Sequence, residues 1–415
     1  MTRYPFPERK ITRLFTLLCL FGLLYLSRDT LVTSGILGFY KAQACMLGLL
    51  ALIGIAFLWQ NRKRLKEILL DARAGAMVLC AVIVLVPMAA KRDWQLMYFS
   101  VLICVFAALF FSYFLSYREL AKYYVVLLAV LGIYSMAAAY VLRLLPDRGL
   151  LPVPVFQNQN DVEFYNFLFS FVPLEYVKMR NFGIFREPGV YQFFLILGLF
   201  LCQYTARWKK ERTMWILSGI LALTLVTTFA TGGIAELGLM CIVVFFDKKL
   251  YRNKWVWAAL AVLTAAGAAL AAYCIAQKNG LYWEVYDMII GKFTYQEESI
   301  GDRLGSVVVN LQAFLKNPLF GSPIAQVLYA IGNNTTSSLI VLAVLGLPGF
   351  CLHAAGWIAL AWEKERKLWV NGMLVLILFM SFNTQNLIAD LFFWLFPMMA
   401  LTERVLPKLP KRKVH

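Results

Sequence analysis

The sequence predicts an all-α polytopic membrane protein. Hydrophobic residues make up 61% of the 415 residues and the mean hydropathy is +0.69, well above the values of soluble domains. The apolar residues fall in runs of roughly 20, the length that a helix needs to cross about 30 Å of hydrocarbon. Short connections rich in Lys and Arg separate many of these runs. We therefore expect a single integral membrane domain over residues 1–415, embedded in a lipid bilayer.

The apolar runs predict about twelve transmembrane helices. The first run follows Arg3, Arg9, Lys10 and Arg13 and has no small-residue cleavage site behind it. This pattern is typical of a retained signal anchor rather than of a removed signal peptide. The expected spans are residues 11–27, 31–58, 74–90, 94–115, 121–144, 188–206, 213–230, 232–246, 255–276, 335–361, 368–387 and 389–403.

The basic residues predict how these helices are oriented. Most of the 40 Lys and Arg fall on one side when the amino terminus is assigned to the cytoplasm, in clusters such as residues 62–64 and 248–254. This is the bias of the positive-inside rule, so both termini are expected in the cytoplasm. The same bias accounts for the net charge of +17 without a nucleic-acid partner, which would require one basic folded surface.

Two long segments are expected on the outer side, residues 145–187 and 277–334. Long connections commonly carry function. In the second segment, helical spacing predicts an amphipathic helix over residues 303–316, capped by Asp302 and ended by Lys316-Asn317-Pro318. Such a helix lies on the membrane surface or covers a cavity in the bundle. Its apolar face is Leu304, Val307, Val308, Leu311, Phe314 and Leu315, and its polar face is Arg303, Ser306 and Asn310.

A charged pair ends the first outer segment. Arg186 and Glu187 stand directly before Pro188, a residue that favours the first turn of a helix. Ionisable residues at the rim of a membrane bundle are costly and commonly mark a functional site. The alternatives are a salt bridge or a helix-start charge for Glu187, and an interfacial anchor for Arg186 and Arg303.

Three motifs follow one another over residues 181–349. They are Gly183-Ile184-Phe185-Arg186-Glu187-Pro188-Gly189; Arg303 with the helix after it and Asn317-Pro318-Leu319-Phe320-Gly321; and Asn334-Thr335-Thr336-Ser337-Ser338-Leu339 with Leu345-Gly346-Leu347-Pro348-Gly349. In type, order and spacing they resemble the O-antigen polymerase and O-antigen ligase superfamily of bacterial envelope polysaccharide assembly.

The resemblance implies a GT-C-like membrane glycosyltransferase, with its active site on the extracytoplasmic side of the bacterial cytoplasmic membrane. As a polymerase it would transfer a glycan linked to a polyprenyl diphosphate, such as undecaprenyl diphosphate. The acceptor would be the non-reducing-end hydroxyl of another lipid-linked repeat unit, and the lipid diphosphate would leave. A flippase and a chain-length regulator are the implied protein partners. The sugars and the linkage stay open, as does the choice between O-antigen, capsule and exopolysaccharide.

Two positions depart from the family pattern. Members often carry Ser-Arg before the glycines of a Thr-x-Ser-Arg-Gly run, whereas residues 228–233 of this chain read Thr-Phe-Ala-Thr-Gly-Gly and lack that arginine. Ligase-like members place a histidine before the helix asparagine, and Asn333 stands there. Because a neutral amide does not accept a proton near neutral pH, this departure favours the polymerase over the ligase.

The resemblance also assigns roles to individual residues. Arg186 and Arg303 are expected to hold the diphosphate without a metal or other cofactor, because a guanidinium binds two oxygens at once. Glu187 is expected to orient or deprotonate the attacking hydroxyl. The candidate substrate-binding residues are Lys178, Arg180, Tyr191, Gln192, Asn310, Asn333, Asn334 and Thr335.

No metal site is predicted, since the eight cysteines lack ligand spacing and the chain has only two histidines. The outer carboxylates of Glu297, Glu298 and Asp302 are the alternative that a hard cation would use.

Two other functions stay open. An O-antigen-type ligase would use the same donor and pass the glycan to a lipid or another acceptor. A flippase or exporter of lipid-linked oligosaccharides would also need cations facing an outer cavity, but is expected to place charges deep along its spans.

Overall fold

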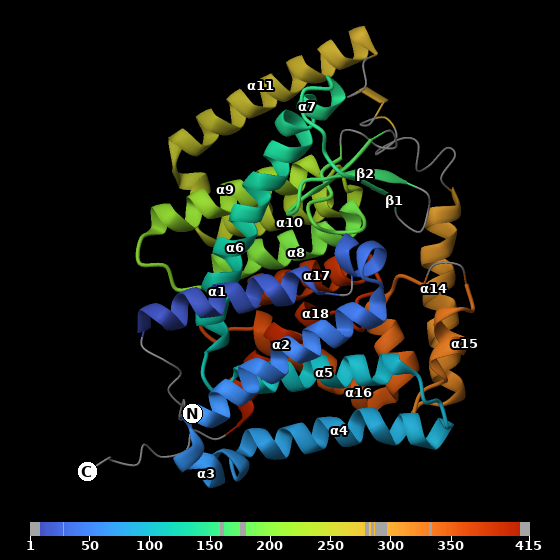
Figure 1. Ribbon diagram of the computed structural model, residues 1–415. Coiled ribbons are helices and arrows are strands. Elements are labelled where there is room, and N and C mark those ends of the chain that lie inside the picture. The colour runs from blue at the N-terminus through green and yellow to red at the C-terminus, as the bar shows by residue number, and fades with distance from the viewer. Residues whose placement is uncertain are drawn as a thin grey trace.

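The computed structural model describes residues 9–27, 29–157, 162–174, 180–278, 282–283, 286, 297–331 and 334–406. It is a mostly helical assembly (Figure 1). Five helices are long and apolar enough to cross a membrane, as expected of a membrane protein. They are Phe39–Gln60, Ala72–Lys91, Tyr117–Asp147, Pro188–Thr205 and Ser337–Ala361.

Every expected span contains a helix of the structure. Single apolar runs thus predicted the helices well, although most ends differ by a few residues. The helices are α1 (Arg9–Tyr25), α2 (Phe39–Gln60), α4 (Ala72–Lys91), α5 (Leu96–Phe111), α6 (Tyr117–Ala137), α8 (Pro188–Phe200), α9 (Glu211–Thr227), α10 (Thr231–Asp247), α11 (Lys254–Gln277), α16 (Ser337–Ala361), α17 (Leu368–Phe382) and α18 (Leu391–Val405). Shorter helices are α3 (Leu65–Leu69), α7 (Leu144–Asp147) and α15 (Ile324–Leu328).

The expected span over residues 31–58 is not one helix. A π-helical turn, η1 (Val32–Ile36), comes first, and α2 starts only at Phe39. Gly38 between them has a φ of 77°, a left-handed conformation that a residue without a side chain adopts at little cost. The chain therefore breaks at this glycine, which sequence hydropathy does not detect.

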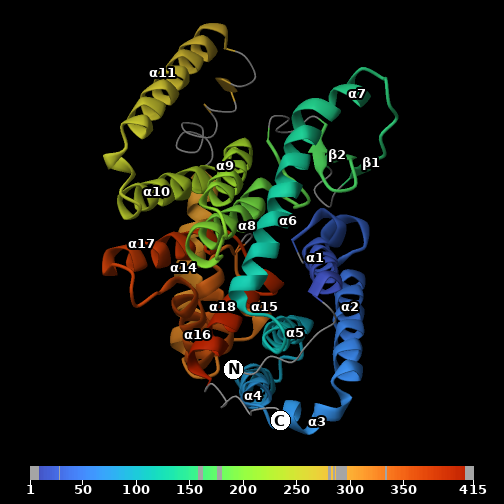
Figure 2. The same cartoon turned by 90° about the vertical axis from the view of Figure 1, so that its left-hand side faces the viewer.

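The helix bundle has two ends, which we call the Arg186 end and the Glu363 end after residues that lie there. At the Arg186 end, the Asn181 amide donates to the carbonyl of Thr227 at the end of α9, at 2.9 Å. The hydroxyl of Ser337, at the start of α16, donates to the carbonyl of Gln385 beyond the end of α17. The ends of α9 and α17 therefore lie beside the starts of α8 and α16, so successive helices run in opposite directions. Figure 2 shows α4 and α5 nearly end-on.

At the opposite, Glu363 end, the start of α6 meets the ends of α16 and α18. Arg118 donates to Glu363 at 2.8 Å, and the Tyr117 amide donates to Glu403 at 2.9 Å. A run that begins at one end and finishes at the other, as α6, α16 and α18 do, is the arrangement that a membrane-crossing bundle requires.

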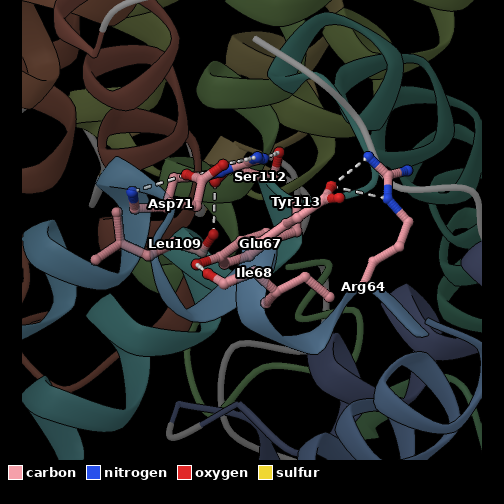
Figure 3. Close-up of polar contacts among 8 residues, drawn as sticks. Arg64, Glu67, Ile68, Asp71, Leu109, Ser112 and Tyr113 are labelled. Atoms are coloured by element: carbon pink, nitrogen blue, oxygen red, sulfur yellow. Dashed lines mark hydrogen bonds and ion pairs between the residues drawn. The ribbon is translucent and has the colours of Figure 1, made fainter. Parts of the chain in front are cut away.

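A buried ion pair ties α4 to the end of α5. Arg73 donates to both carboxylate oxygens of Asp71 at 2.7 Å, and also to the carbonyl of Ser112 at 2.7 Å. Its guanidinium lies 4.1 Å from the centre of the Tyr113 ring, whose hydroxyl donates to the carbonyl of Ile68 (Figure 3). All three guanidinium nitrogens of Arg73 and both carboxylate oxygens of Asp71 bond within the fold, so we interpret the cluster as structural.

The segment of residues 145–187 carries a small antiparallel sheet that hydropathy did not predict. Its order is β1 (Val155–Gln157), β2 (Glu163–Asn166) and β3 (Phe171–Pro173), with Phe156 opposite Phe164. The Phe171 amide donates to the carbonyl of Gly183 at 2.7 Å, so β3 is joined to the segment that carries Arg186. Strands of three or four residues are too short to leave a periodic signal in a sequence.

The helix expected over residues 303–316 exists but begins earlier than expected. Helix α14 spans Glu297–Lys316, so Asp302 lies within it and is not its cap, whereas the end at Lys316 is confirmed. The helix lies at the right of Figure 1 and packs on α16 and α15. On its expected polar face, Ser306 and Asn310 are fully covered and Arg303 is exposed, while the apolar Leu304 and Leu315 are 65% and 73% exposed.

Candidate functional site

The segment ahead of α8 is fixed by a short backbone pairing with the chain that follows α1. The Arg186 amide donates to the carbonyl of Asp29 at 3.0 Å, and the Leu31 amide donates to that of Ile184 at 2.9 Å. Thr30 and Phe185 form the bridge between these two bonds. Because the backbone is held on both sides, the Arg186 side chain starts from a defined position.

The guanidinium of Arg186 joins two carboxylates. Its Nε donates to Oδ1 of Asp29 at 2.9 Å, and its Nη2 lies 3.2 Å from Oε1 of Glu187. The Asp29 side chain is 5% exposed, whereas Arg186 and Glu187 are 38% and 41% exposed. One carboxylate is therefore a buried support, and the other lies open beside the arginine.

Electrostatics keep Arg186 charged. Burial lowers the pKa of its guanidinium, but the charges of Asp29 and Glu187 outweigh burial and raise the pKa above its ordinary value. Oδ2 of Asp29 is buried and has no hydrogen-bond partner among the described residues. Arg186 is thus a partly exposed cation whose Nη1 bonds to none of the described residues.

Tyr191 packs against the segment that precedes α8. Its hydroxyl lies 3.2 Å from that of Ser135, which also accepts a bond from Asn181 at 3.0 Å. Gly183 has a φ of 56°, and a side chain there would meet the Tyr191 ring at 2.7 Å. The close fit explains the glycine, and it gives Tyr191 a packing role, with 1% of its surface exposed.

Gln192 points to a different neighbour, because consecutive helix residues are turned by about 100°. Its side-chain amide donates to Oε1 of Glu236 on α10 at 3.2 Å. The amide of Gln192 packs on Gly232 and Gly233, where a Cβ would come within 3.0 and 2.9 Å of it. The two glycines therefore let α8 and α10 approach closely.

Glu236 links this contact to α14. It is 1% exposed, and its Oε2 has no hydrogen-bond partner among the described residues, although the hydroxyl of Ser381 lies beside it. The charge of Arg303 acts on the Glu236 carboxylate, so these two residues lie near each other. Arg303 itself is exposed. Gln192 and Arg303 are thus neighbours of one buried carboxylate.

Among the helices that begin at the Arg186 end are α8, α10, α16 and α18. The residues before α8 and α10, Glu187 and Ala230, make no side-chain cap. Helix starts carry partial positive charge and unsatisfied amide N–H groups, both of which attract anions. The starts of α8 and α10 lie close together, since Gln192 in the second turn of α8 packs on Gly232 and Gly233 in the first turn of α10.

Asn310, Asn334 and Thr336 form a buried amide cluster between α14 and the start of α16. Asn310 and Asn334 exchange hydrogen bonds of 2.9 Å, and Asn310 also donates to Thr336 at 2.7 Å. Thr335 is 5% exposed and its hydroxyl has no hydrogen-bond partner among the described residues. The cluster fixes the position of α14, which carries Arg303.

The structure therefore brings the expected site residues together in three groups. Arg186 and Glu187 are in contact. Gln192 bonds to Glu236, and Arg303 is near enough for its charge to act on that carboxylate. Asn310, Asn334 and Thr335 lie where α14 packs on the start of α16. Glu187 and Gln192 are five positions apart, roughly 8 Å along a helix, so the first two groups are adjacent. Arg180 is half-buried. Lys178 and Asn333 lie outside the described residues.

Two carboxylates of the site were not chosen from the sequence. Asp29 stands 157 positions before Arg186, and an isolated aspartate after an apolar run gives no signal of its own. Glu236 had a signal, an acidic residue inside an apolar run, which commonly marks function. Its neighbours could not be inferred, because they come from α8, α14 and α17.

Within the described part of the chain, no three His, Cys, Asp or Glu side chains lie close enough to hold a metal ion. Comparison with protein-family models, with curated proteins and with solved structures gives no match to this chain.

Proposed function

We propose that this protein is a metal-independent membrane glycosyltransferase that polymerises polyprenyl-diphosphate-linked oligosaccharides. The observation that carries the proposal is the pairing of a half-buried Arg186 with the buried Asp29 at the joint start of α8 and α10. A cation held in place beside two helix starts suits an anionic leaving group. The sequence resemblance supplies the class of that group, a lipid diphosphate.

During the reaction, negative charge develops on the leaving group at the position where the Arg186 cation lies. The acceptor hydroxyl oxygen forms a bond to the anomeric carbon of the donor, and the bond from that carbon to the diphosphate oxygen breaks. The lipid diphosphate leaves with the electron pair. Arg186 and Arg303 stabilise that charge through charge-assisted hydrogen bonds, assisted by the amides at the starts of α8 and α10.

A general base must take the proton from the hydroxyl of the acceptor glycan. Glu187 suits this task because its carboxylate is 41% exposed beside Arg186 and can be reached by a substrate. Glu236 is a carboxylate with a free oxygen but is 1% exposed, so it is better suited to positioning Gln192 and Arg303. We assign the base to Glu187.

The proposal includes a topology. Twelve spans in a bacterial cytoplasmic membrane, with both termini in the cytoplasm, put the Arg186 end outside, where lipid-linked repeat units are polymerised. In this orientation α14 lies at the outer surface with its exposed leucines toward lipid, and the basic loops at the Glu363 end face the cytoplasm.

The test uses purified protein in vesicles that contain only polyprenyl-diphosphate-linked repeat units. A polymerase lengthens them into a ladder and releases lipid diphosphate, with or without a chelator. A ligase makes single transfers onto an added lipid core and gives no ladder from the repeat units alone. An exporter moves the repeat units across the vesicle and changes no glycosidic bond. Either of the last two results would overturn the polymerase assignment.

A further inference from the structure

A second charged site lies at the Glu363 end, away from the residues proposed for catalysis. A cavity of about 870 Å³ opens there between the start of α6, the segment before α9, the connection from α16 to α17, and the end of α18. Five cationic and four acidic side chains line it: Arg118, Lys122, Arg207, Lys364 and Arg404, with Glu119, Glu363, Glu365 and Glu403.

The acidic side chains are mostly engaged within the fold. Glu363 binds Arg118 at 2.8 Å, and Glu403 accepts the Tyr117 amide at 2.9 Å. Glu119 completes a capping box with Ser116 at the start of α6. Three of the four carboxylates thus hold helix ends together, although each keeps its negative charge.

Most of the cations are not engaged in this way. The side chains of Lys122, Arg207, Lys364 and Arg404 make no hydrogen bond or ion pair with any residue that the structure describes. They come from four different segments, so the fold gathers them around one space. Arg207, Lys364 and Arg404 are exposed, and Lys122 is half-buried. The cavity therefore has one more cationic than acidic side chain, and most of its cationic side chains have no partner among the described residues.

We propose that this cavity binds a phosphate-bearing anion. Several guanidinium and ammonium groups from separate segments can bind the oxygens of one phosphate. Lysine binds phosphate as a point charge, and arginine binds two of its oxygens at once through parallel N–H donors. Basic pockets between helices at the cytoplasmic side of a membrane take phosphate headgroups of anionic lipids, and a soluble phosphate compound has the same chemistry. The inference does not depend on glycosyl transfer.

The experiment measures binding to the full-length protein in a neutral detergent. The probes are dihexanoyl phosphatidylglycerol, dihexanoyl phosphatidylcholine and inorganic pyrophosphate. The cavity variant carries Lys122→Gln, Arg207→Gln and Lys364→Gln. The control carries Lys249→Gln, Arg252→Gln and Lys254→Gln, the same loss of charge on exposed residues that do not line the cavity.

We expect an anionic probe to bind the wild type and the control equally, and to bind the cavity variant at least about tenfold more weakly. Preference for phosphatidylglycerol identifies a lipid headgroup, and preference for pyrophosphate identifies a soluble ligand. Equal affinity for the cavity variant and the control, or no preference over phosphatidylcholine, would overturn the proposal. Thermal unfolding of both variants shows whether each is folded when it is tested.

Discussion

The contact between Arg186 and Asp29 makes a prediction about stability that can be separated from activity. Arg186→Ala leaves the Asp29 carboxylate buried, with both oxygens lacking a side-chain partner, because Oδ2 has none already. Removing one partner of a fully buried pair costs about 3 to 5 kcal/mol. Since Arg186 is 38% exposed and water replaces part of its contact, we expect about 2 kcal/mol.

The chain offers a matched control for this change. Arg64 is also 38% exposed, but its partner Glu67 is 52% exposed rather than 5%. Arg64→Ala is therefore expected to cost less than about 1 kcal/mol, as exposed pairs do. The comparison isolates the burial of the carboxylate from the loss of an arginine.

The assay is unfolding of the purified protein by titration with a denaturing detergent, carried out as a double-mutant cycle. Asp29→Asn removes the charge that Arg186→Ala strands, so the double variant should be more stable than the sum of the single changes implies, by about 1 kcal/mol. If Arg186→Ala proved as stable as Arg64→Ala and the cycle were additive, Asp29 would not be the support of the arginine.

Three further predictions concern single contacts. Arg73→Met should lower the free energy of unfolding by about 3 kcal/mol. Burial raises the pKa of Asp71 but its bonds to Arg73 lower it more, to below its ordinary value; the wild type should therefore lose stability as the pH falls below about 4. Arg73→Met should instead gain stability on acidification, because burial alone then raises that pKa. Asn310→Ala strands two buried polar groups, about 2 kcal/mol, so amide hydrogen exchange in α14 should be roughly 30-fold faster; unchanged exchange would mean that other contacts hold the helix. Glu187→Gln should slow transfer by about 100-fold, and Glu236→Gln, which can keep its bond to Gln192, should slow it by less than tenfold; the reverse order would assign the base to Glu236.

The helices were predictable because each is a long run in which nearly every residue is apolar. Such a run has one stable conformation in hydrocarbon, and no knowledge of its neighbours is needed. The break at Gly38 and the sheet of residues 155–173 were not predictable in this way. Both depend on contacts between segments, such as the bond from Phe171 to Gly183.

Helix α14 shows the same limit in another form. Its periodicity was evident, but the periodicity does not say which face packs on the protein. In water the apolar face would be buried, whereas here Asn310 faces α16 and Leu315 faces outward. Lipid offers an apolar surface of its own, so the buried face is chosen by hydrogen bonding.

The candidate site was predictable in its arginines and not in their partners. The motif around Arg186 and the start of α14 at Arg303 are local features of the sequence. Asp29 and Glu236 meet their partners only when the helices pack together, and no residue next to either of them in the sequence indicates its role.

The central claim is that Arg186 and Arg303 hold the leaving lipid diphosphate, and the most direct measurement is the rate of lipid diphosphate release per folded molecule. Wild type, Arg186→Ala, Arg303→Ala and the control Arg64→Ala would be compared in vesicles containing repeat units. We predict that each site variant is slower by at least about 30-fold, the lower bound for losing a contact to a desolvated charge, with poor rescue by lysine. Release at the wild-type rate by both alanine variants would contradict the account and leave the two arginines as anchors at the membrane surface.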